Sequence, residues 1–185
     1  MKKILFIFAI SICSLVAWAY DFSAVAPSGQ TLYYTITSDS TVEVAGGSNP
    51  SGSLTIPDTV VNGSATYSVT SIGENAFEDC TGLVTINFPN SVTSIGRAAF
   101  YYCTGLTNVD IPNSVTSLGN YAFSHCSGIT TLSLSNSLTR IGMQTFGLCS
   151  SLTNVDIPNS VTYIGYGAFY DCSSLTAVTI PNSVT

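Results

Sequence analysis

The sequence has very little positive charge. Its 185 residues include four lysines and arginines and one histidine, against ten acidic residues. Lys2 and Lys3 lie at the N-terminus, so residues 20–185 keep only Arg97 and Arg140 against all ten acids, a formal net charge of −8. Phosphate backbones are bound by clustered lysine and arginine. The composition therefore excludes nucleic acid as a partner, and it disfavours anionic membranes and phosphorylated ligands.

Beyond residue 19 the sequence also lacks an apolar run long enough to span a membrane. Before that point it reads MKKILFIFAISICSLVAWA, with a positive start, an apolar stretch from Ile4 to Val16 and the small-residue pattern Ala17-Trp18-Ala19. This pattern is typical of a secretory signal peptide. We expect residues 1–19 to be cleaved and the mature chain to leave the cytoplasm, with an uncleaved anchor as the alternative.

What the sequence does contain is a strict internal repeat. Five types of residue recur with a spacing of 23, without a slip, from about Ser68 to Thr185. The Ile-Gly or Leu-Gly pairs, the phenylalanines and the cysteines mark it most clearly: Gly73, Gly96, Gly119, Gly142 and Gly165; Phe77, Phe100, Phe123, Phe146 and Phe169; Cys80, Cys103, Cys126, Cys149 and Cys172. Such a period indicates stacked structural units, so it has to be recognised before any local structure is predicted.

Each repeat contains one clear strand pattern. In LTNVDIP, Leu106 to Pro112, apolar Val109 and Ile111 alternate with polar Asn108 and Asp110, as in a half-buried strand. The Asn-Ser pair that follows is typical of a turn. The glycine of each Ile-Gly pair predicts a second corner, with a positive φ or a close backbone approach. A unit this small buries its apolar face only against its neighbours, so the repeat predicts a β-rich solenoid whose phenylalanines lie roughly 5 Å apart.

The pattern LxxVxIPNSVTxIGxxAFxxCxxL resembles the BspA-type leucine-rich repeats of secreted and surface-attached bacterial proteins. Ser135 in place of Pro and Thr145 in place of Ala are the main departures. The resemblance implies a right-handed leucine-rich repeat solenoid with a parallel sheet on one face and short turns or 3-10 segments elsewhere. It also implies a location outside the cell or on the bacterial surface, and attachment to other proteins as the usual role.

The two ends of the repeat array differ. Residues 20–67 carry two strand patterns near 31–37 and 41–44, a first repeat edge at 54–60 and the insertion VNGSATYSV, which together predict a β-rich N-terminal cap with a hairpin. Residues 68–185 are the five repeats, of which the last is incomplete. Because the sequence stops within a repeat, we expect either a longer protein or a last strand covered by another molecule, which would permit end-to-end self-association.

The remaining chemistry is sparse. Five cysteines in one column favour buried free thiols over a metal site, whose ligands must converge on one point, although the odd count leaves a single oxidised pair open. His125 occupies a position that other repeats fill with Asp, Tyr or Leu, and no nucleophile and base can be assembled around it. Asp110 and Asp156 lie in one column on an open face, which disfavours a carboxylate pair. We predict no enzyme activity, catalytic residue, metal or cofactor.

Two surfaces are candidates for binding. The first is the outward face of the strands, where polar side chains form columns. Its proposed partner-binding residues are Asn108, Asp110, Asn154, Asp156, Thr131 and Ser133. The second consists of tyrosines at positions that other repeats fill with small or polar residues, which predicts that they are exposed; those proposed for glycan or partner contact are Tyr101, Tyr121, Tyr166 and Tyr170.

The sequence therefore predicts a non-enzymatic repeat scaffold. The resemblance implies an extracellular protein partner and a role in adhesion to host or matrix proteins. Ordinary polarity of exposed strand positions accounts for the first surface equally well, and ordinary Ser/Tyr variation accounts for the second. Carbohydrate binding through the tyrosines, or a structural spacer that presents another domain, are the alternative functions.

Overall fold

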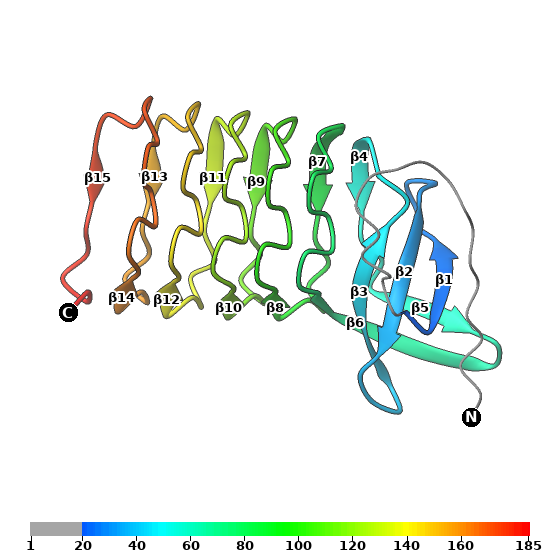
Figure 1. Ribbon diagram of the computed structural model, residues 1–185. Helices are drawn as coiled ribbons and strands as arrows, with labels where there is room; N and C mark the ends of the chain where they lie inside the picture. The colour runs from blue at the N-terminus through cyan, green and yellow to red at the C-terminus, as the bar shows by residue number, and fades with distance from the viewer. Residues whose placement is uncertain (1–19) are drawn as a thin grey trace.

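The computed structural model describes residues 20–185, and the predicted signal peptide lies outside them. The described residues form strands joined by turns, with no helix, and so contain no helix that could cross a membrane. A group of longer strands lies at the N-terminal end, and coils stack from it towards the C-terminus (Figure 1). The solenoid predicted from the 23-residue spacing is confirmed.

One row of parallel strands follows the strand pattern of the repeats. It consists of β4 (Gly52–Thr55), β7 (Leu83–Asn87), β9 (Asn108–Asp110), β11 (Thr131–Ser133), β13 (Val155–Asp156) and β15 (Val178–Thr179). Strands β4, β7, β9 and β11 form one sheet, and β13 pairs with β15 in another. Val109 is buried between exposed Asn108 and Asp110, which is the alternation predicted from the sequence.

A second row of parallel strands, most of them only two residues long, lies at the Ile-Gly pairs, where the sequence analysis predicts only a corner. It consists of β6 (Ala65–Ile72), β8 (Ser94–Ile95), β10 (Ser117–Leu118), β12 (Arg140–Ile141) and β14 (Tyr163–Ile164). Strands β6, β8 and β10 are successive neighbours in one sheet, and β12 pairs with β14 in a separate sheet. Coils that are neighbours within these sheets are therefore paired through two rows of strands.

The N-terminal strands form a cap that shares a sheet with the repeats. Strands β1 (Phe22–Val25), β2 (Thr31–Ile36) and β3 (Thr41–Gly47) pair antiparallel in chain order. Strand β3 then pairs parallel with β6, and β6 pairs parallel with β8 of the next coil. The insertion forms an antiparallel hairpin of β5 (Thr59–Asn62) and β6, and Gly63 at its tip has a φ of 64°. Backbone hydrogen bonds thus join the cap to the first repeat.

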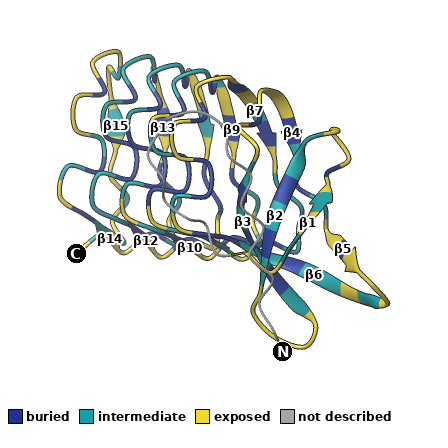
Figure 2. Cartoon of the chain, turned by 45° about the vertical axis from the view of Figure 1, so that its right-hand side comes forward, coloured by how far each residue is buried: buried dark blue, intermediate teal, exposed yellow. Residues whose placement is uncertain are grey.

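The core of the solenoid is a stack of phenylalanine rings. Phe77, Phe100, Phe123 and Phe146 are fully buried, and successive ring centroids from Phe77 to Phe169 lie 5.0 to 5.7 Å apart in stacked geometry. Figure 2 shows the buried residues along the inside of the coils and the exposed ones on the outer edges. The predicted spacing of the rings is confirmed, and it lies in the range that aromatic pairs prefer.

The corners of the coil differ in part from the prediction. The Asn-Ser turn is closed by the backbone, as in the bond from the N–H of Val115 to the carbonyl of Pro112 (2.9 Å). The repeat glycines 73, 96, 119, 142 and 165 do not have positive φ. The close backbone approach is confirmed at Gly96, where a Cβ would lie 2.7 Å from the amide nitrogen of Glu74, whereas at Gly142 the nearest atom would be the side-chain oxygen of Asn120.

Residues with a left-handed backbone conformation (positive φ) do recur every 23 positions, but they lie in the turn around the phenylalanine. The residues with positive φ there are Asn75, Ala98, Tyr121, Gln144 and Gly167, and then Asp79, Tyr102, His125, Leu148 and Asp171. This turn reverses the chain twice within a few residues, and the left-handed conformation makes each reversal tight. Residue type does not reveal these positions, because nine of the ten are not glycine.

Candidate functional site

The outward face of β9, β11 and β13, which we call the strand face, brings the predicted partner-binding residues together. Asn108 and Thr131 are register neighbours on adjacent strands, and so are Asp110 and Ser133. The hydroxyl of Thr131 donates a hydrogen bond to the side-chain carbonyl of Asn108. Neighbouring strands lie about 4.8 Å apart, so these side chains form a continuous polar surface.

All six predicted strand-face residues are exposed: Asn108, Asp110, Thr131, Ser133, Asn154 and Asp156. A shallow groove of about 250 Å³ opens on this face, between the coil of β11 and the coil of β13. Ser133 and Asp156 line it from opposite sides, together with Leu132 and Ile157. The strand face is therefore not uniformly flat, and its hollow combines a hydroxyl, a carboxylate and some apolar surface.

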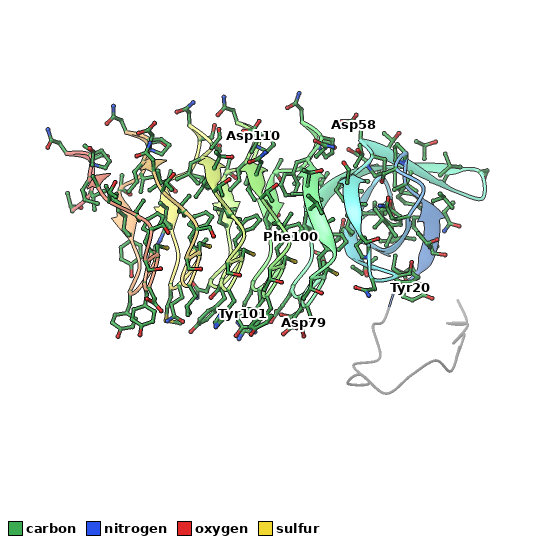
Figure 3. The ribbon with its side chains drawn as sticks, turned by 90° about the horizontal axis from the view of Figure 1, so that it is seen from above. Tyr20, Asp58, Asp79, Phe100, Tyr101 and Asp110 are labelled. Atoms are coloured by element: carbon green, nitrogen blue, oxygen red, sulfur yellow. The ribbon has the colours of Figure 1, made fainter. Side chains whose placement is uncertain are left out.

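The predicted tyrosines lie on another side of the coils. Figure 3 shows Asp110 and Tyr101 on opposite sides of the solenoid, with Phe100 between them. Tyr166 and Tyr170 are 81% and 58% exposed, so the expected exposure of these two side chains is confirmed. They belong to one coil and present amphipathic rings to solvent.

The expectation that Tyr101 and Tyr121 are also exposed is wrong. Both are half-buried. The ring of Tyr101 packs on His125, with centroids 4.9 Å apart. The ring of Tyr121 lies 5.9 Å from the guanidinium of Arg97, and its hydroxyl contacts the sulfur of Met143 at 3.7 Å. Side chains of the adjacent coils, one repeat position away from the equivalent site, contact these rings, and a single repeat does not reveal those contacts.

The five cysteines are free and buried. Each thiol from Cys103 onwards donates a hydrogen bond to a phenylalanine carbonyl of the preceding coil, as from Cys103 to Phe77 at 3.0 Å. Burial, with a smaller contribution from nearby Cys103 and Asp79, raises the pKa of the Cys80 thiol to about 12. Burial also raises the pKa of Cys126, Cys149 and Cys172. These thiols are protonated at neutral pH, so they act as small apolar residues.

The acidic side chains do not converge. Within residues 20–185, no group of three or more His, Cys, Asp or Glu side chains is arranged to hold a metal ion. Asp110 and Asp156 lie in the same column of the strand face, with Ser133 on the strand between them. His125 forms a hydrogen bond with Ser124 (3.1 Å) and packs on Tyr102.

Sequence reasoning missed one further surface feature. Arg140 lies over the ring of Tyr163, with 4.3 Å between its guanidinium carbon and the ring centroid. The two residues are register neighbours on β12 and β14. A signal was present in the sequence, because the equivalent positions in earlier coils are serines: Ser71, Ser94 and Ser117.

Comparison with known proteins agrees with this architecture. The BspA-type leucine-rich repeat family matches residues 67–185 in six copies. A leucine-rich repeat protein of T. pallidum has a similar structure, with a TM-score of 0.75 and 32% identity over 81% of this chain and 69% of that protein. No curated protein matches the sequence significantly.

Two further solved structures resemble the chain over a longer stretch. A leucine-rich cell surface protein of Faecalibacterium prausnitzii is 26% identical, with a TM-score of 0.52 over 88% of this chain and 55% of its own. A leucine-rich repeat protein of Bacteroides ovatus is 27% identical, with a TM-score of 0.53 over 89% and 54%. The chain thus spans about half of each of these two proteins. On its repeat pattern, its coil geometry and these matches, the chain belongs to the BspA-type leucine-rich repeat family.

Proposed function

We propose that this protein is a non-enzymatic scaffold, secreted or held at a bacterial cell surface, that binds an extracellular protein partner through its strand face. The observation that carries the proposal is the row of exposed hydrogen-bonding side chains on β9 and β11, which continues at Asn154 and Asp156. Repeat proteins commonly bind along such extended faces. The F. prausnitzii relative, which is described as a cell surface protein, supports the location.

The solenoid gives this face a rigid support. Directly inside the strand face, Val109, Val155 and Ile111 are almost completely buried, and the phenylalanine stack lies behind them. Polar side chains on a rigid backbone lose little conformational entropy on binding, which favours affinity for a partner of complementary shape. The groove beside Ser133 and Asp156 offers a place for one protruding side chain of the partner.

The test is binding of the purified protein to an array of extracellular-matrix proteins and glycans. In one variant, Asn108, Asp110, Asn154 and Asp156 are changed to Ala; in the other, the exposed Tyr166 and Tyr170 are changed to Ser. Protein binding that is lost only in the first variant supports the proposal. Binding that survives in the first variant contradicts it.

A second candidate function is carbohydrate binding through the tyrosines, which the exposure of Tyr166 and Tyr170 favours. Exposed aromatic rings stack on the apolar faces of sugars. Glycan binding that is lost only in the tyrosine variant would support it. If the folded protein binds neither class, the role of a structural spacer is favoured.

A further inference from the structure

The pairing of strands is interrupted between two coils, and it is interrupted in both rows of strands. The turn around the phenylalanine remains bonded across the same boundary, as from the N–H of Phe123 to the carbonyl of Thr145 at 2.9 Å. Within the part of the chain that the structure describes, β10 and β12 are not paired, and neither are β11 and β13. Both gaps lie between the same two coils, the one that begins near Ser114 and the one that begins near Ser137. A groove opens at each gap.

Hydrogen bonds show the interruption in the second row in detail. At the other coil boundaries the repeat glycine donates to the preceding coil, as from Gly119 to Ile95 and from Gly165 to Ile141, both at 2.8 Å. The equivalent bond from Gly142 to Leu118 is absent from residues 20–185, and so is the bond from Thr139 to Thr116. Two backbone N–H groups therefore have no partner in the described chain.

The side chain of Asn120 occupies the gap. Its carbonyl oxygen accepts a hydrogen bond from the N–H of Met143 at 2.9 Å, and it lies against Gly142. This bond fixes the orientation of the amide, so its NH₂ group points elsewhere and makes no hydrogen bond within residues 20–185. Asn120 thus adds a free donor beside the two backbone N–H groups.

The groove at this gap, which we call the Arg140 groove, has a volume of about 490 Å³. Its polar lining includes Thr116, Ser117, Asn120, Thr139, Arg140 and Tyr163. The Arg140 guanidinium lies over the Tyr163 ring, which holds it at the edge of the groove. The groove therefore combines a planar cation, an aromatic ring, hydroxyl groups and free N–H donors.

The charges around the groove are opposite to those of the whole chain. No acidic residue occurs between Asp110 and Asp156 in the sequence, and this stretch supplies all of the lining except Tyr163. Of the two cations in residues 20–185, Arg97 is paired with Glu74 at 2.7 Å, whereas Arg140 has no carboxylate partner in that part of the chain. The Arg140 groove is thus rich in donors and contains no acid.

We propose that the Arg140 groove binds an acidic sugar, that is, a sugar unit with one carboxylate. The guanidinium is suited to bidentate contact with the carboxylate. The free N–H groups and the hydroxyls are suited to ring hydroxyls, and the Tyr163 ring is suited to the apolar face of the sugar. Because Arg140 is the only cation at the groove, a single carboxylate fits better than a polyanion. This proposal concerns a different row of strands from the strand face, so neither proposal depends on the other.

The experiment is titration of the purified protein with sialyllactose, a glucuronic acid disaccharide and lactose, followed by calorimetry and by NMR chemical shifts. We expect both acidic probes to bind with millimolar or better affinity and lactose to bind at least ten-fold more weakly. Changing Arg140→Gln removes the charge-assisted hydrogen bonds and should lower the affinity for the acidic probes by about 10-fold to 100-fold. Arg140→Lys keeps the charge but loses the planar pair of donors that can bind a carboxylate through two hydrogen bonds, so it should give an intermediate affinity.

Matched controls separate the site from general effects. Tyr163→Ser restores the residue of earlier coils and should weaken binding of both acidic probes. Arg97→Gln removes the other cation, outside the groove, and should leave the affinity unchanged, as should the four alanines on the strand face. Thermal unfolding of each variant checks that the fold is retained, which the exposure of Arg140 favours.

Three outcomes would overturn the proposal. The first is equal binding of lactose and sialyllactose, and the second is unchanged binding in the Arg140→Gln protein. The third is binding of a short acidic peptide in the groove without binding of either acidic sugar, which would assign the groove to a protein ligand.

Discussion

In the cap, β2 and β3 bury alternate side chains, such as Leu32 and Tyr34 on β2 and Val42 and Val44 on β3. In the repeats, by contrast, each buried position recurs every 23 residues. Its side chain packs on the same type of residue in the adjacent coil, as Phe100 does on Phe123. A cap residue therefore has unlike neighbours, whereas a repeat residue has like neighbours on both sides. The comparison explains why the repeats extend by simple addition and the cap does not.

The largest expected effect concerns the stack of like residues. Phe123→Ala removes a ring that stacks on Phe100 and Phe146, at 5.0 and 5.7 Å, and leaves a cavity in the core. We expect the free energy of unfolding to fall by about 3–5 kcal/mol, measured by chemical denaturation. Phe169→Ala is the matched control, because Phe169 is half-buried and, among residues 20–185, stacks on Phe146 alone. Equal losses for the two variants would contradict the view that each ring is stabilised from both sides.

The next effect tests the close approach of the coils at the repeat glycines. A Cβ at Gly96 would lie 2.7 Å from backbone atoms of Gly73 and Glu74, which cannot move aside alone. We expect Gly96→Ala to lower the free energy of unfolding by about 1–3 kcal/mol. At Gly147 the nearest atom would be 3.4 Å away, so Gly147→Ala should cost little or slightly stabilise the protein. If both alanines are tolerated alike, the glycine column has no steric role.

The third effect is the dependence of stability on pH. It concerns the repeats, which contain the buried thiols, and not the cap, which contains none. The pKa of Cys80 is about 12 in the folded chain against an ordinary value of 9.0. A raised pKa stabilises the folded state fully below pH 9, and this contribution is lost as the pH rises from 9 towards 12. Denaturation at several pH values should show a loss of about 1.4 kcal/mol per pH unit for each such thiol.

A matched variant tests whether the loss of stability above pH 9 comes from the Cys80 thiol. Cys80→Ala should lower the stability at pH 7 but reduce the dependence on pH above 9, because one proton fewer is released on unfolding. A stability that is constant up to pH 11 in the unchanged protein would show that the thiols ionise without unfolding.

The smallest effect lies in the cap. The hydroxyl of Tyr34 is buried without a hydrogen-bond partner among residues 20–185, and burial raises its pKa to about 12. Tyr34→Phe keeps the ring that stacks on Phe22 and removes the unpaired polar atom. We expect the free energy of unfolding to rise by about 1 kcal/mol, while Tyr33→Phe, at a half-buried ring, should change it little. A loss of stability in Tyr34→Phe would show that the hydroxyl has a partner in the folded protein.

Much of the fold was predictable because identical residues at a fixed spacing must occupy identical places in stacked coils. The strand from Asn108 to Asp110, the ring stack and the buried thiols follow from that rule. The second row of strands was not predicted, because its two-residue strands are too short to show an alternating pattern. The left-handed positions were not predicted either, because residues as different as Ala98, His125 and Leu148 occupy them.

The surfaces divide in the same way. The exposure of the strand-face residues followed from alternation within one strand. The covering of Tyr101 by His125 and the pairing of Arg140 with Tyr163 depend on residues 23 or 24 positions apart, so they needed the register of the coils.

The sequence by itself determined the solenoid and the residues of its core, since the free energy of burying apolar groups depends on their type and spacing. Only the tertiary structure decided where the pairing of strands is interrupted. That break depends on whether backbone groups of Leu118 and Gly142 come within hydrogen-bond distance, and the side chain of Asn120 lies between the two coils. The loss of these few hydrogen bonds is decided by the packing between the two neighbouring coils. The repeat pattern does not reveal it, because the pattern is the same in both coils.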